Sequence, residues 1–197
     1  MPKPELSLGI PGDGRCLFRS VVHGACLRAG NPSPNENHEK ELADELRAKV
    51  VDEFIKRRAD TEWFLEGDFD TYVIQMRQPH IWGGEPELLM SSHVLNAPIT
   101  VYMWDKKSSC LKIIAEYGQE YGKDNPIRVL YNGYGHYDAL RSPSGGTLSK
   151  LEDTPLCKKS IWIKWRKLIQ RLRALFPILL SKFKTSCLLV KPFSHTC

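Results

Sequence analysis

The sequence predicts an α+β fold, in which a small β-sheet is flanked by helices and followed by a basic, amphipathic C-terminal tail. Two observations indicate this class. Apolar residues recur at helical spacing through most of 16–95, whereas 98–132 show the two-residue period of β-strands. Helices followed by strands are typical of α+β proteins or of a small α/β sandwich.

Four helices are expected in the first half of the chain. A Gly-rich turn at 11–15 precedes a helix that begins at Cys16, and the Pro- and Asn-containing segment 28–35 ends it. A second helix is expected at 36–60, because its apolar residues recur every four positions. Further helices are expected at 68–77 and at 87–95, the last one directly after Pro86.

Three strands are expected in the second half. The segments 98–104 and 111–117 are rich in β-branched and aromatic residues, and the turn 105–109 joins them. A third strand is expected at 127–132, where the segment 133–140 ends it as a loop. We expect the strands to be antiparallel.

The composition is that of a globular protein. Of the 197 residues, 42% are hydrophobic and 26% are charged, which excludes a largely disordered chain, a collagen-like fibre and a coiled-coil rod. No apolar run is long enough to span a bilayer as a helix, and the first residues lack the apolar core of a secretory signal. The six cysteines contain no CxxC pair. We therefore expect reduced thiols and a cytoplasmic location, with the nucleus or a membrane surface as alternatives.

The charge of +5 is unevenly distributed along the chain. Residues 151–197 hold ten Lys or Arg and two acids, a net +8, which leaves the first 150 residues at −3. The Pro-, Ser- and Gly-containing stretch predicts a linker at 141–154 between a body at 1–140 and a tail at 155–197. Because the body has no basic stripe, we do not expect nucleic acid as a partner.

The tail contains an apolar stripe at helical spacing from Ile161 to Leu179, with Lys and Arg on the remaining positions. A basic amphipathic helix of this kind can lie on an anionic membrane surface or bind a protein groove. Two alternatives stay open. The stripe packs on the body, or the tail is a passive extension.

Cys16 is the candidate nucleophile. It follows a Gly-rich turn and opens a helix, where free backbone N–H groups favour a thiolate and, with those of the turn, can form an oxyanion hole. The alternative is that Cys16 is a small buried residue at the start of a core helix.

His136 is the candidate base among the six histidines. It follows a strand and a Gly-Tyr-Gly loop, and Asp138 lies two residues on, on the same side of an extended backbone. Asp138 can therefore orient the imidazole. His23 is seven positions after Cys16 on one helix, about 10.5 Å along its axis and too far for proton transfer. The alternative for 135–138 is a polar hairpin turn.

Three blocks in this order, GDGRCLFRSV, WGGEPELLMSSHVLNAPITVYM and YNGYGHYDAL, resemble the ovarian tumour (OTU) family of cysteine proteases, which are deubiquitinases. The resemblance spans roughly residues 8–141. It implies a papain-like fold and hydrolysis of isopeptide or peptide bonds at the ubiquitin C-terminus. It also implies ubiquitin, polyubiquitin and ubiquitinated proteins as partners, and no metal or organic cofactor.

The resemblance implies four catalytic residues: Asp13, Cys16, His136 and Asp138. Cys16 is then the nucleophile, His136 the general acid and base, and Asp138 the residue that orients it. Asp13 then shapes the loop and the oxyanion region. Two other functions stay open, namely a catalytically silent ubiquitin-binding module and an adaptor that binds a membrane or a protein through its tail.

Overall fold

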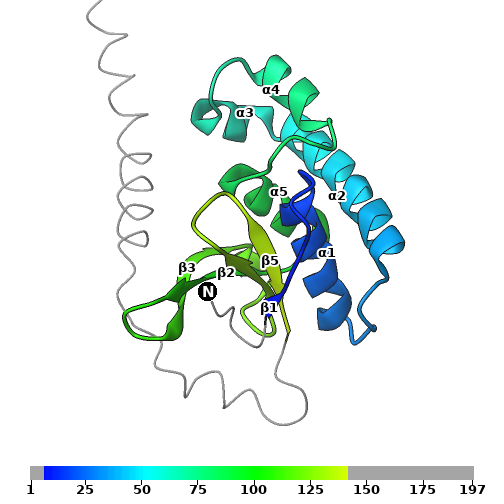
Figure 1. Cartoon of the computed structure of the whole chain (residues 1–197). Coiled ribbons are helices and arrows are strands. Elements are labelled where there is room, and N and C mark those ends of the chain that lie inside the picture. Colours follow the sequence, from blue (N-terminus) through cyan, green and yellow to red (C-terminus); the bar gives the residue numbers. More distant parts are fainter. Residues whose placement is uncertain (1–6, 142–197) are drawn as a thin grey trace, which may run out of the picture. The chain divides into compact units, whose positions relative to one another are not determined.

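The computed structural model describes residues 7–141, which form helices packed on one mixed sheet (Figure 1). The expected α+β class is confirmed. The helices are α1 (Cys16–Arg28), α2 (Glu36–Lys56), α3 (Arg58–Thr61), α4 (Phe69–Met76) and α5 (Glu85–Leu95), with short 3₁₀ turns η1 (Glu62–Phe64) and η2 (Gln119–Tyr121). The strands are β1 (Ser7–Leu8), β2 (Ile99–Asp105), β3 (Cys110–Tyr117), β4 (Ile127–Tyr131) and β5 (Tyr137–Leu140).

The strand order is β1-β5-β4-β2-β3. The strands β2 and β3 form the antiparallel hairpin that the sequence predicts. The expectation of an all-antiparallel sheet is wrong, because β4 pairs parallel with β2. The chain reverses at the hairpin, reverses again through η2 and enters on the other side of β2. After these two reversals the chain runs in the same direction as β2, so β4 pairs parallel with it. The periodicity of apolar residues does not indicate on which side of β2 the next strand pairs.

The segment 133–140 is a loop only in its first part. Its last four residues form β5, which pairs antiparallel with β4 on one side and with β1 on the other. All four residues of β5 are buried. These four residues are fewer than in a typical strand and include an aspartate, so their sequence pattern did not predict a strand.

The helices agree closely with expectation except that α2 ends at Lys56 rather than at residue 60. Arg57 leaves helical geometry and a separate short helix, α3, follows it. Pro86 lies in the first turn of α5. Backbone N–H groups in this turn have no acceptor within the helix, so the N–H that proline lacks is not needed there.

Helix α1 is central to the core. It packs against α2 on one side and against β4 and β5 on the other (Figure 1). Phe18 and Val21 of α1 are fully buried with Val50 and Phe54 of α2. Burying each such side chain contributes about 1.5–3 kcal/mol, so the first residue of α1 is held rigidly beside β5.

The predicted tail, 155–197, lies outside the described residues, as does the predicted linker apart from Arg141. The expectations about both stay predictions. Between residues 7 and 141, no helix has the length and apolar character needed to cross a membrane.

Candidate active site

Cys16 stands at the junction of a tight turn and α1, as the sequence predicts. The turn requires glycine at Gly14, whose φ is +85°. A Cβ at this position would lie 2.5 Å from the backbone of His80. The turn before Cys16 is therefore packed directly against the loop that follows α4.

His136 and Asp138 are in contact at the start of β5. The Nε2 atom of His136 lies 3.1 Å from Oδ1 of Asp138. The Asp138 carboxylate is buried, and it accepts a hydrogen bond of 2.9 Å from the N–H of Ile10 and one of 3.4 Å from the hydroxyl of Ser7. The segment that contains β1 therefore holds the aspartate that faces the imidazole.

The start of β5 lies against the start of α1, which brings Cys16 to this pair. The backbone N–H groups of Tyr137 and Leu17 are close enough to the Cys16 sulfur to lower the pKa of the thiol. A Cβ on Gly12 would lie 3.9 Å from Nδ1 of His136, so this nitrogen faces the turn that precedes Cys16. The structure thus gathers the thiol, the imidazole and the carboxylate at one place.

Burial sets the electrostatics of the thiol. Burial raises the pKa of Cys16, and the Asp13 and Asp138 carboxylates raise it further. The N–H groups of Tyr137 and Leu17 lower this pKa, in the direction expected for a helix start. Burial outweighs these N–H groups, so the pKa of Cys16 lies above that of an ordinary thiol although the helix start acts in the expected direction.

Asp13 is bound within the turn. Its Oδ1 accepts the N–H of Arg15 at 3.0 Å, and its Oδ2 accepts a hydrogen bond of 3.0 Å from Nη1 of Arg19. Burial raises the pKa of Asp13, but these hydrogen bonds and the Arg19 charge outweigh it and hold the pKa below its usual value. In these contacts Asp13 shapes the turn, whereas Asp138 contacts the imidazole.

Several residues around the site were missed in the sequence. His23, which the sequence places too far along α1 for proton transfer to Cys16, is buried, and its Nδ1 lies 3.0 Å from Glu39, which also pairs with Arg19. Glu87 is buried and accepts the N–H of Gly84 at 2.6 Å. Its spacing of three residues after Gly84 at a helix start is the signal that indicates this role.

The block around Trp82 lies beside His136. The Trp82 ring packs on Gly135, where a Cβ would come within 2.7 Å of the ring. Trp82 is 59% exposed and Tyr134 is 84% exposed. Two exposed aromatic side chains therefore come from the segments next to the catalytic candidates.

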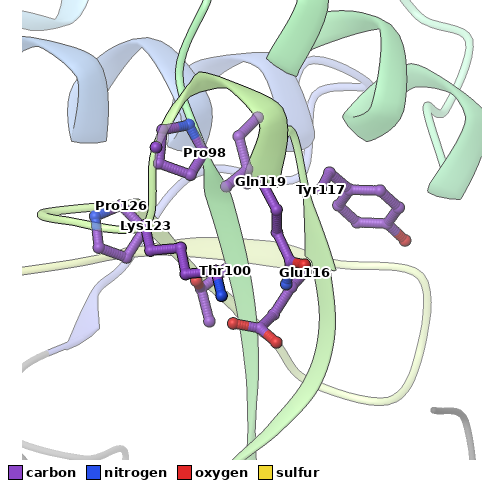
Figure 2. A pocket seen from close by; sticks show the side chains of 9 residues that line it. Pro98, Thr100, Glu116, Tyr117, Gln119, Lys123 and Pro126 are labelled. Atoms are coloured by element: carbon purple, nitrogen blue, oxygen red, sulfur yellow. The ribbon is translucent and has the colours of Figure 1, made fainter.

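A separate pocket of about 210 Å³ lies at one end of β2 and β3 (Figure 2). Figure 2 shows Thr100, Glu116 and Lys123 around it, together with Pro98 and Pro126. None of the four predicted site residues lines it. Within residues 7–141, no group of three or more His, Cys, Asp or Glu is placed to hold a metal ion.

The chain matches known proteins over the same region. The model of the OTU-like cysteine protease family matches residues 11–138. The chain is 72% identical over 133 residues to OVARIAN TUMOR DOMAIN-containing deubiquitinating enzyme 4 of Arabidopsis thaliana, over 68% of this chain and 42% of that protein. It is 32% identical over 155 residues to deubiquitinating enzyme 3 of the same plant, over 67% of this chain and 66% of that protein. The chain thus spans less than two thirds of the length of either relative.

Solved structures share the fold. The OTU domain of OTUD1 superposes with a TM-score of 0.55 at 24% identity, over 69% of this chain and 85% of that one. The Hazara virus OTU bound to ubiquitin superposes with a TM-score of 0.52 at 20% identity, over 71% of this chain and 82% of that one.

Proposed function

This chain belongs to the OTU-like cysteine protease family, and from that premise we propose that it is a deubiquitinase that hydrolyses isopeptide or peptide bonds at the C-terminus of ubiquitin. One observation carries the proposal. Cys16 opens α1 against the start of β5, where His136 is in contact with Asp138. The relative that is 72% identical over 133 residues is itself named a deubiquitinating enzyme.

In the proposed mechanism His136 takes the thiol proton, and the Cys16 sulfur attacks the carbonyl carbon at the ubiquitin C-terminus. The developing oxyanion accepts hydrogen bonds from backbone N–H groups of the turn and of the start of α1, an interaction worth about 10²–10³ in rate per donor. His136 then gives its proton to the departing lysine amine, and a thioester with Cys16 remains. Water, activated by His136, attacks the thioester and releases ubiquitin and the thiol.

The two aspartates take different parts in this scheme. Asp138 accepts a hydrogen bond from Nε2–H of His136 and so leaves Nδ1 free to exchange the proton with the sulfur. Asp13 holds the N–H of Arg15 and the Arg19 side chain, and so fixes the turn that supplies the N–H groups.

The exposed aromatic rings of Trp82 and Tyr134 support a polypeptide substrate. Aromatic side chains that remain exposed next to an active site are typical of protein-binding surfaces. We propose that an extended ubiquitin C-terminus passes this surface on its way to Cys16.

A ubiquitin probe with a C-terminal alkyne tests the proposal. The full chain should form a one-to-one covalent adduct, Cys16→Ala should form none, and Cys26→Ser should react as the wild type does. Cys26 is a suitable control, because it is a free thiol on the same helix, in its last turn. Binding without an adduct would instead indicate a silent ubiquitin-binding module.

A further inference from the structure

Arg47 is a buried guanidinium with no acidic partner. It lies on α2 and is 2% exposed. Among residues 7–141, no carboxylate lies within ion-pair distance of it, and its Nε has no hydrogen-bond partner. Burial lowers its pKa. The Asp44 and Glu87 carboxylates favour the charged form without outweighing burial, and a buried charge with no paired carboxylate is unfavourable compared with an apolar side chain of similar length.

The terminal nitrogens of Arg47 bind backbone carbonyls from two loops. Nη2 donates to the carbonyl of Gly14 at 2.8 Å and to that of Pro79 at 3.1 Å. Nη1 donates to the carbonyl of Met76 at 3.1 Å. The guanidinium carbon also lies 4.3 Å from the centre of the Phe18 ring. Arg47 therefore ties the turn before Cys16 to the loop after α4.

The peptide between Gly14 and Arg15 is held at both ends. Its carbonyl accepts a hydrogen bond from Arg47, and its N–H donates to Oδ1 of Asp13. Glycine at φ +85° has little intrinsic resistance to a peptide flip. A flip would turn the Gly14 carbonyl toward the Asp13 carboxylate, so that both hydrogen bonds would be lost and the turn would be released. Because the proposed oxyanion hole consists of backbone N–H groups of this turn and of the start of α1, the fixed direction of the Gly14–Arg15 peptide is a condition for aiming them.

We infer that Arg47 is a positioning residue for catalysis, which holds the Gly14 carbonyl inward and thereby keeps the N–H groups of the turn aimed at the oxyanion. This inference rests on the proposed hydrolase function. Arg47 touches neither the thiol nor the imidazole in this scheme, and it acts through the backbone of the turn.

The test separates oxyanion stabilisation from thiol reactivity. Hydrolysis of a ubiquitin C-terminal fluorogenic substrate requires the oxyanion hole, whereas alkylation of Cys16 by iodoacetamide does not. Both are measured on the full chain, with alkylation followed on the Cys16 peptide by mass spectrometry. Arg77→Met is the matched control, because Arg77 is an exposed arginine that pairs with Asp52 at 2.7 Å.

Arg47→Met should lower kcat by about tenfold to a hundredfold, while KM and the alkylation rate stay within about threefold, because a misdirected turn resembles the loss of an oxyanion donor. Arg47→Lys should recover part of kcat, since one ammonium can reach fewer carbonyls than the planar guanidinium. Arg77→Met should leave all three quantities unchanged.

Equal loss of hydrolysis and alkylation in Arg47→Met would overturn the inference, because it would indicate general disruption of the site. If Arg47→Met unfolds below the assay temperature, Arg47→Lys carries the test, and a wild-type kcat in that variant overturns the inference. A wild-type chain that does not hydrolyse the substrate overturns the proposed function, and the positioning role falls with it. If the wild type hydrolyses the substrate and Arg47→Met does so with the same kcat, the inference about Arg47 is overturned and the proposed function stands.

Discussion

Oδ1 of Asp138 faces Nε2 of His136 at 3.1 Å and also accepts the N–H of Ile10 at 2.9 Å. One carboxylate oxygen therefore joins the imidazole to the segment that begins with β1. Because Nε2 donates to this oxygen, the lone pair of the neutral imidazole is on Nδ1, which faces the turn before Cys16. The orientation of the proposed base thus depends on a contact between the beginning and the end of the described chain.

The first prediction compares the base with the residue that orients it. His136→Ala should reduce kcat/KM of the proposed hydrolysis by about 10³ or more, as expected when one member of a catalytic unit is lost. Asp138→Asn should cost less, about tenfold, because the Asn Oδ1 can still accept from both Ile10 and the imidazole.

Steady-state kinetics on a ubiquitin C-terminal fluorogenic substrate check this order. The Asn Nδ2 group would replace Oδ2 and can donate to the Ser7 hydroxyl, so the variant is expected to stay folded. An Asp138→Asn protein as inactive as His136→Ala would show that the negative charge, rather than the hydrogen bond, is what the imidazole needs.

The second prediction concerns the pH dependence of the thiol. Burial raises the pKa of Cys16 above that of an ordinary thiol, so the thiol is largely protonated at neutral pH and the thiolate fraction grows as the pH rises. Alkylation of Cys16 by iodoacetamide should therefore accelerate through the alkaline range. At pH 7 the wild type should react about tenfold faster than His136→Ala, because only the wild type has a base to accept the proton.

At pH values above the raised pKa of Cys16 the two rates should converge, since both thiols are then ionised without help from a base. The rates are measured on the Cys16 peptide by mass spectrometry. Equal rates at pH 7 would mean that the thiol proton is accepted by a group other than His136.

The sequence predicted the parts of the site that rest on local patterns. The helix start at Cys16 follows from a Gly-rich turn before an apolar stripe, and the pairing of His136 with Asp138 follows from their spacing on an extended backbone. The contacts of Asp138 with the segment at 7–10 depend on β1, a two-residue strand that no periodicity can reveal.

Arg47 shows why the remaining residues were missed. In the sequence it is one of several charged residues on a charged helix, which usually face solvent. Its position differs from that of the exposed charged residues of α2 and is shared only by Glu39 among the charged residues of this helix. It lies four residues after Ala43 and three before Val50, on the stripe whose other members are buried. An arginine within an apolar stripe is thus a signal, but its backbone partners at Gly14 and Pro79 come from the tertiary fold.

The third prediction concerns Asp13. Asp13→Asn keeps an acceptor for the N–H of Arg15 but loses the charge that pairs with Arg19. The pKa of Asp13 is held below its usual value in the folded chain, so its contribution to stability is present above the unfolded pKa and is lost as the pH falls through the folded pKa. At pH 7 the substitution should therefore lower the free energy of unfolding by about 1 kcal/mol.

Thermal unfolding of both proteins between pH 7 and pH 3.5 checks the sign. The difference in Tm between wild type and variant should shrink as the pH is lowered, because the wild-type carboxylate becomes protonated. A difference that stays constant over this range would show that the Asp13 charge does not stabilise the turn.

The last prediction separates the two constraints on the turn before Cys16. Gly14 and Gly30 both have positive φ angles, of +85° and +76°, but only Gly14 is packed against other atoms. A Cβ at Gly30 has no heavy atom within 4 Å outside its chain neighbours, whereas a Cβ at Gly14 would lie 2.5 Å from the backbone of His80. Gly30→Ala therefore measures the conformational penalty alone, about 1–2 kcal/mol.

Gly14→Ala adds a clash that no side-chain rotation can relieve, since the atoms of His80 in question belong to the backbone. The turn or the loop after α4 must move, and either movement disturbs Arg47, which donates to the Gly14 carbonyl in the turn and to the Pro79 carbonyl in the loop. Gly30→Ala should lower Tm by a few degrees with kcat unchanged, whereas Gly14→Ala should lower Tm further and reduce kcat by about tenfold or more. Measuring Tm and kcat of both variants gives the comparison. If Gly14→Ala retains full kcat at a temperature where it is folded, the close packing of the turn against His80 is not needed for catalysis.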